Sequence, residues 1–155
     1  MRSDSPRRLM PERRPTVRQK RAVAERAGGR CEYCLSPAGY APSPFSVEHI
    51  EPRVGGGSRD LSNLALACQG CNNLKYTHTE ATDPLTGEMA PLYHPRLHRW
   101  RDHFSWGEDL IEMVGLTPTG RATIKELQLN RRNVCNLRRV LLFFGEHPPA
   151  GTGEG

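Results

Sequence analysis

Hydrophobic and polar positions change their period several times along the chain, and each change predicts an element. In residues 16–29 apolar and small side chains recur every three to four positions and end at a glycine pair, which is typical of a helix. Residues 45–50 alternate as a strand does, and Pro52 ends the pattern. Leu64–Ala67 predicts a second strand, antiparallel to the first, and residues 72–78 predict a helix.

The second half of the chain predicts strands followed by helices. Residues 79–96 lack a period and are expected to be loop, whereas residues 97–106 and 110–114 interleave aromatic and charged positions as short strands do. A helix is expected to begin at Pro118. A last helix over residues 131–144 has an apolar face, and two basic pairs on it either track DNA phosphates or keep the helix soluble: Arg131–Arg132 and Arg138–Arg139.

Length and composition favour one small domain with a modest core. The chain has 155 residues, a mean hydropathy of −0.64, 15 glycines and 13 prolines. We expect an arm without fixed structure over residues 1–15, a domain over residues 16–145 and a disordered tail over residues 146–155. No apolar run is long enough for a membrane span, and the N-terminus lacks the apolar core of a secretory signal. A cytoplasmic, reducing compartment is therefore expected.

Charge is concentrated at one end of the chain. The first 30 residues carry ten Lys/Arg against three acids, a net charge of +7, so the remaining 125 residues have a net charge of −2. A basic arm joined to a nearly neutral body suits attraction to a polyanion. A disordered, solubilising tail would show the same charge.

Two Cys-x-x-Cys pairs, Cys31/Cys34 and Cys68/Cys71, are separated by 33 residues. Each pair presents two thiolates from one turn, and two such turns together form a tetrahedral site suited to Zn²⁺. The reducing compartment disfavours disulfides, and the presence of both pairs disfavours a redox dithiol. Because four thiolates leave no open position, the pattern predicts a structural zinc. The fifth cysteine, Cys135, is expected to pack as a small apolar residue.

An acid–histidine pair, Glu48–His49, lies inside the interval that the zinc closes. Phosphodiester hydrolysis needs a base for the attacking water, which imidazole supplies near pH 7, and a hard cation such as Mg²⁺ with oxygen ligands. Neighbours on a regular strand point to opposite faces, so both side chains reach one site only where the strand ends. The pair alone does not distinguish a catalytic site from a binding module.

The order Glu48–His49, then Asn63 in S-N-L-A-L, then Asn72 in C-N-N-L-K, resembles the HNH endonuclease family over roughly residues 29–78. The resemblance implies hydrolysis of DNA phosphodiesters on a ββα-metal fold. His49 then falls on the general base, and Asn63 on the residue that orders the loop and orients the histidine. Glu48 and Asn72 fall on the ligands of a catalytic Mg²⁺ or Mn²⁺.

The same resemblance suggests how DNA is held. Lys75 matches a basic residue that meets a phosphate, and the ββα helix is expected in the minor groove. Three basic side chains of the N-terminal helix would add non-specific affinity along the backbone: Arg18, Lys20 and Arg21.

We therefore predict an α+β protein with a ββα-metal core stapled by a four-cysteine zinc site over about residues 29–78. An N-terminal helix and a C-terminal strand–helix extension over about residues 97–145 flank it. The predicted function is that of a metal-dependent HNH endonuclease. Two alternatives stay open: a non-catalytic zinc-ribbon DNA-binding module, and a nuclease active only with a partner. A homodimer or a larger nuclease assembly stays open as well.

Overall fold

The computed structural model describes residues 14–153, so most of the arm expected at residues 1–15 lies outside the described residues. Its helices and strands follow in this order: α1 (Val17–Arg26), β1 (Ser46–His49), β2 (Leu64–Ala67), α2 (Gln69–Lys75), β3 (Glu80–Thr82), β4 (Met89–Pro91), α3 (Trp100–His103), β5 (Phe104–Trp106), β6 (Met113–Gly115), α4 (Pro118–Glu126) and α5 (Arg132–Phe143). Within residues 14–153, three two-stranded antiparallel sheets accompany the helices, which confirms the predicted α+β class. None of the described helices is long and apolar enough to span a membrane.

The predicted N-terminal helix is confirmed as α1. The hydroxyl of Thr16 accepts the backbone N–H of Gln19, and the Gln19 side chain accepts the N–H of Thr16, so the two form a capping box. Val23 is the buried residue of α1 and packs against Leu64 and Leu66 of β2. The helix thereby covers one face of the β1–β2 hairpin.

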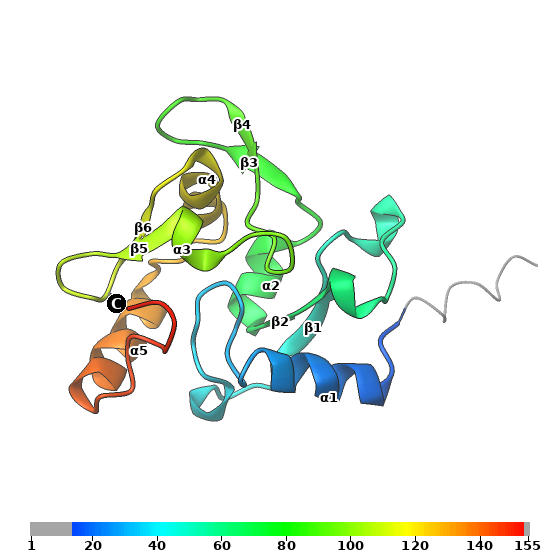
Figure 1. Cartoon of the computed structure of the whole chain (residues 1–155), viewed down its shortest axis with the longest axis horizontal. Helices are drawn as coiled ribbons and strands as arrows, with labels where there is room; N and C mark the ends of the chain where they lie inside the picture. Colours follow the sequence, from blue (N-terminus) through cyan, green and yellow to red (C-terminus); the bar gives the residue numbers. More distant parts are fainter. Residues whose placement is uncertain (1–13, 154–155) are drawn as a thin grey trace, which may run out of the picture.

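Strands β1 and β2 pair as predicted, with His49 opposite Leu64 and Glu48 opposite Ala65. All four residues of β2 are buried, because the strand has covered faces on both sides. The α1 face buries Leu64 and Leu66, while the other face places Ala65 and Ala67 in the main core with the cysteines. Figure 1 shows α1 along one side of this hairpin and α2 near the centre of the molecule.

Helix α2 begins earlier and ends earlier than predicted. It starts at Gln69 rather than Asn72, because the sulfur of Cys68 acts as the N-cap and accepts the N–H of Cys71 at 3.4 Å. It ends at Lys75 rather than near His78, since Tyr76 takes a positive φ of 51°. Cysteine is not a preferred capping residue, so sequence signals placed this boundary too late.

The prediction of loop for residues 79–96 is wrong, because β3 and β4 form a hairpin there. Each strand is three residues long, too short to show a period. Asp83 sets the turn: its carboxylate accepts the N–H of Leu85 and the hydroxyl of Thr86. The prediction of a strand over residues 97–106 is half right, since α3 precedes β5.

The C-terminal extension packs against the part of the chain that carries the four cysteines, β1, β2 and α2. Helix α4 covers β3, β4 and β6, and one core cluster joins the cysteines and Ala65 to Phe104, Met113 and Leu129. In Figure 1 β3, β4, α3 and α4 lie above α2 in the view, while α5 lies at the lower left and α1 along the bottom.

Residues 146–153, predicted as part of a disordered tail, pack against the extension instead. The buried His147 ring donates from Nε2 to the carbonyl of Leu110 at 2.6 Å, and Arg101 donates to the carbonyl of Gly151 at 2.7 Å. Their side chains are small or polar, so the sequence pattern of this segment resembles a tail although backbone carbonyls fix it.

Candidate metal centre and nuclease site

The four cysteines of the two Cys-x-x-Cys pairs converge on one point. Their Sγ atoms all lie within 4.8 Å of one another, and Cys34 and Cys68 are 3.7 Å apart. Tetrahedral Zn–S bonds of about 2.3 Å put sulfur atoms about 3.8 Å apart, so the donor set fits a structural Zn²⁺ with no open position. In each pair the second cysteine donates its backbone N–H to the first sulfur, at 3.5 Å and 3.4 Å.

The electrostatics of this four-cysteine site favour a cation. Burial raises the pKa of Cys31, whereas hydrogen bonding with the Cys31 sulfur lowers the pKa of Cys34 to about 7. Four sulfurs in contact cannot all carry charge without a cation between them, and a zinc ion provides that charge.

An arginine from outside the cysteine pairs also faces the sulfurs. Arg131, the residue before α5, donates toward Cys68 Sγ at 3.4 Å and Cys71 Sγ at 3.5 Å. Burial lowers the pKa of Arg131, but the nearby Cys71 sulfur opposes this and the pKa is raised overall. The two arginines of the first basic pair therefore differ: Arg131 contacts the sulfurs of the metal centre, whereas Arg132 is exposed.

His49 is the last residue of β1 and is half-buried. Strand alternation places its side chain on the face of Val47, which packs toward the Val23–Leu66 cluster under α1. Glu48 points the other way, into the main core. By this alternation the acid and the histidine are expected to face opposite sides of the hairpin.

The carboxylate of Glu48 is buried and fully engaged. Its residue is 6% exposed, Tyr33 donates its hydroxyl to Oε1, and the Lys75 ammonium lies 3.3 Å from Oε2. Burial raises the pKa of Glu48, while the charge of Lys75 and the Tyr33 hydroxyl act in the opposite direction. A carboxylate with both oxygens occupied in the interior does not fit the predicted role of ligand to a catalytic Mg²⁺ or Mn²⁺.

Lys75 also lies in a different place from the one predicted. It is 1% exposed and donates to the carbonyl of Ile50 at 2.9 Å in addition to pairing with Glu48. A buried ammonium with these partners does not favour a phosphate contact at the surface, and the nucleic-acid contact expected for Lys75 stays a prediction. Asn72, one helical turn earlier on α2, is half-buried.

Asn63 holds the connection between β1 and β2. Its Oδ1 accepts the N–H of Glu51 at 2.8 Å, and its Nδ2 donates to the carbonyls of Glu51 at 3.1 Å and Ser58 at 2.8 Å. The loop leaves no room for a side chain at Gly57, since a Cβ there would lie 1.8 Å from the Glu51 carbonyl oxygen. Asn63 thus orders the loop that follows His49, and its part in catalysis stays a prediction.

The basic side chains of α1 stay at the surface beside this loop. Arg18, Lys20 and Arg21 are exposed. Gln19 donates to the carbonyl of Arg59 at 2.9 Å, so the N-terminal end of α1 touches the loop between β1 and β2. The basic residues predicted to contact nucleic acid therefore lie on the side of the hairpin that α1 covers.

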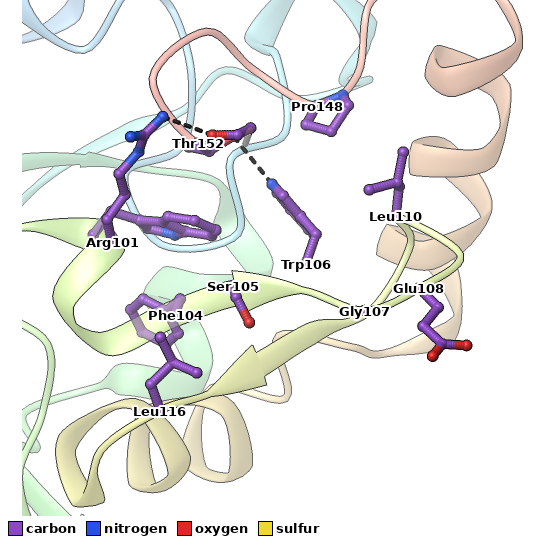
Figure 2. Close-up of a pocket in the computed structure, with 12 residues that line it drawn as sticks. Arg101, Phe104, Ser105, Trp106, Gly107, Glu108, Leu110, Leu116, Pro148 and Thr152 are labelled. Atoms are coloured by element: carbon purple, nitrogen blue, oxygen red, sulfur yellow. Dashed lines mark hydrogen bonds between the residues drawn. The ribbon is translucent and has the colours of Figure 1, made fainter. Parts of the chain in front are cut away.

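The extension contains a cavity away from the cysteines and His49. It measures about 710 Å³ and none of residues 31–78 lines it. Figure 2 shows Trp106 and Phe104 in its wall and Thr152 of the C-terminal segment over it, held by the Trp106 Nε1–H at 3.1 Å. The guanidinium of Arg138 lies over the Trp106 ring, 5.1 Å from its centroid, and covers one face of the ring.

Two residues of the site, Tyr33 and Arg131, are not predicted by the sequence. Tyr33 stands within the first cysteine pair and Arg131 before the last helix, and neither has a motif signal of its own. Tyrosine at a position enclosed by two metal ligands is a usable hint, because such a turn is buried and its hydroxyl then needs a partner.

Comparison with known proteins identifies one segment of the chain. Residues 31–78 match the model of the HNH endonuclease family, a stretch that contains both cysteine pairs, β1, β2 and α2. No curated protein and no solved structure matches the chain. The four-cysteine cluster agrees with the zinc-binding type of this family.

Proposed function

We propose that this HNH domain, residues 31–78, acts as a DNA endonuclease in which His49 is the general base. The observation that carries the proposal is the family match over a ββα unit that ends its first strand at His49. The HNH family generally hydrolyses DNA, and the chain has a net charge of +5, which suits a polyanionic substrate.

In this proposal the half-buried His49 imidazole accepts the proton of the attacking water. Imidazole suits this step because its neutral form is abundant near pH 7. Asn63 supports the step through the loop after His49, since its three hydrogen bonds fix the backbone of Glu51 and Ser58. A base held by an ordered backbone keeps its direction relative to the phosphate.

A divalent cation, Mg²⁺ or Mn²⁺, stays part of the proposal because it would offset charge on the phosphate. Of the two ligands expected from the resemblance, Asn72 is half-buried and remains a candidate, whereas the buried Glu48 does not fit. The four cysteines hold a separate, structural zinc.

DNA binding is proposed to draw on the exposed basic residues of α1, which lie beside the loop that follows His49. Contacts of this type are made to phosphates and carry no sequence information. Affinity is therefore expected to fall steeply as salt is raised.

Cleavage of a supercoiled plasmid at low salt tests the proposal. The full chain is assayed with Mg²⁺, Mn²⁺ or EDTA, beside His49→Ala and a control, His78→Ala, which alters an exposed histidine of the same segment. Zinc content is measured after EDTA, so that loss of cutting is assigned to the exchangeable cation.

Cation-dependent nicking or linearisation that His49→Ala loses, with zinc and DNA binding intact, supports the nuclease. DNA binding without cutting by the wild type would favour the non-catalytic zinc-ribbon module or a missing partner. Cutting by His49→Ala at the wild-type rate would overturn the role of His49.

A further inference from the structure

We infer that Tyr33, Glu48 and Lys75 form a buried clamp that positions His49, and that Glu48 serves this clamp rather than a catalytic metal. The inference rests on the proposed nuclease function for its consequence, although the clamp itself is a feature of the fold. It assigns three residues a positioning role and removes one from the expected set of metal ligands.

The geometry of the clamp brackets His49 on both sides. The Lys75 ammonium lies 3.3 Å from the Glu48 carboxylate and donates to the carbonyl of Ile50 at 2.9 Å. One side chain from α2 therefore holds the residue before His49 and the residue after it. The end of β1 cannot twist about His49 without breaking one of these two contacts.

The third member ties the clamp to the metal centre. Tyr33 lies between Cys31 and Cys34, is 2% exposed, and donates its hydroxyl to Glu48. A zinc ion that fixes the cysteine turn thus fixes Tyr33, and through it the carboxylate. Lys75 is four residues after Cys71 on α2, so the second cysteine pair holds the other end of the clamp.

Charge explains why Glu48 stays in the interior. Burying a carboxylate without a partner is costly, and here the Lys75 ammonium supplies the positive charge that a divalent cation would otherwise supply. To bind a cation, Glu48 would have to leave both Tyr33 and Lys75, and the buried ammonium would then be left without its counter-ion. Strand alternation adds that Glu48 and His49 face opposite ways.

Four variants of the full chain test the inference: Glu48→Gln, Lys75→Met, the double variant Glu48→Gln/Lys75→Met, and Tyr33→Phe. Glu80→Gln and Lys125→Met, exposed residues outside the HNH segment, control for the change in charge. Each protein is loaded with equal zinc and compared by kcat, KM for a DNA duplex, and the cation concentration that gives half-maximal rate.

We expect Lys75→Met to lower kcat by about 100-fold, since it leaves a buried carboxylate unpaired and frees the end of β1. The double variant should recover at least about tenfold of this loss, because it removes the unpaired charge as well. Glu48→Gln alone should leave the half-maximal cation concentration unchanged. Tyr33→Phe keeps the ion pair and the fold, and should lower kcat by only a few-fold with KM unchanged.

A rise of tenfold or more in the half-maximal cation concentration for Glu48→Gln would show that Glu48 binds the catalytic cation, and would overturn the inference. So would additive effects of Glu48→Gln and Lys75→Met on kcat. If the wild type does not cut DNA, the proposed function fails instead. Non-additive melting temperatures in the same four-protein cycle then still test the clamp.

Discussion

The HNH segment, residues 31–78, and the extension, residues 79–153, are stabilised by different means. The first has two four-residue strands, a metal centre and a buried Glu48–Lys75 pair, whereas the second supplies most of the apolar side chains of the core that the two regions share. Yet arginines of the extension reach into the first. Arg131 faces the sulfurs of Cys68 and Cys71, and Arg138 donates to the carbonyl of Cys34 at 3.1 Å.

The difference teaches that the segment matched by the family is not a self-sufficient unit in this chain. A small unit with little apolar area needs a metal staple, and here it also borrows buried guanidinium groups from a neighbour. Arg96 of the extension makes a further link of this kind, since it pairs with the carboxylate of Glu32, which also accepts the N–H of Leu66 at 2.8 Å. Stability of one region is therefore expected to depend on the other.

Loss of the metal should have the largest effect. Cys68→Ser removes one zinc ligand and the N-cap of α2, and structural zinc sites contribute about 10–16 kcal/mol of apparent binding energy. We expect the whole chain to lose its cooperative thermal transition, the extension included. Cys135→Ser, outside the four-cysteine site, is the control and should keep one zinc per chain. An extension that melts normally in Cys68→Ser would show that the regions are independent.

Removal of the Arg138 side chain should come next. It is 2% exposed and donates to the carbonyls of Ile111, Cys34 and Leu129. Arg138→Met leaves these acceptors buried without a donor, so we expect a loss of at least about 3 kcal/mol in the free energy of unfolding. Denaturant unfolding measures it. Arg139→Met, the exposed neighbour, should change it by less than about 0.5 kcal/mol, and equal losses in both variants would contradict the assignment.

A buried ion pair within the extension should give a smaller, pH-dependent effect. Hydrogen bonds from Arg121, at 2.9 Å and 2.8 Å, hold the pKa of Asp83 well below its usual range. A lowered folded-state pKa stabilises the fold above the unfolded pKa of about 3.9, and the benefit is lost as pH falls toward the folded value. We expect Asp83→Asn to melt below the wild type at pH 7, and the gap to narrow below about pH 4. A gap independent of pH would contradict this.

A local effect on stability is expected in the loop between β1 and β2. Gly57→Ala places a Cβ against the Glu51 carbonyl and the Asn63 amide, so the loop must open locally. We expect a loss of about 2 kcal/mol in the free energy of unfolding, because the clash is with backbone atoms, and a fall of tenfold or more in DNA cleavage. Gly55→Ala, where a Cβ meets only Pro52 at 3.9 Å, should leave both nearly unchanged. Normal cleavage by Gly57→Ala would show that loop order is dispensable.

Much of the first region follows from the sequence, because its signals are local. Spacing alone indicates the cysteine cluster, and alternation indicates β1 and β2. The direction of Glu48 was open in the sequence, since a strand end lets either neighbour reach a site. The direction of Glu48 depends on its buried partners, Lys75 and Tyr33. Because both come from other parts of the chain, no local sequence pattern indicates them.

The extension was harder to predict because its structure depends on contacts between distant residues. Strands β3 and β4 are too short for a period, and the segment after α5 is held through backbone carbonyls. The basic pairs of the last helix looked alike in sequence. In the structure Arg138 is a core residue and Arg139 is exposed, a difference that depends on which side of α5 faces Ile111 and the cysteine turn.

Chemical rescue of His49→Ala tests the central claim most directly. Cleavage of a labelled DNA duplex is followed under single-turnover conditions, at equal zinc content, with increasing imidazole in the buffer. If His49 is the general base, the variant should be at least about 100-fold slower than the wild type, and neutral imidazole should restore part of the rate. His78→Ala should cut normally and ignore imidazole. A His49→Ala protein that binds DNA and cuts at the wild-type rate without imidazole would contradict the claim.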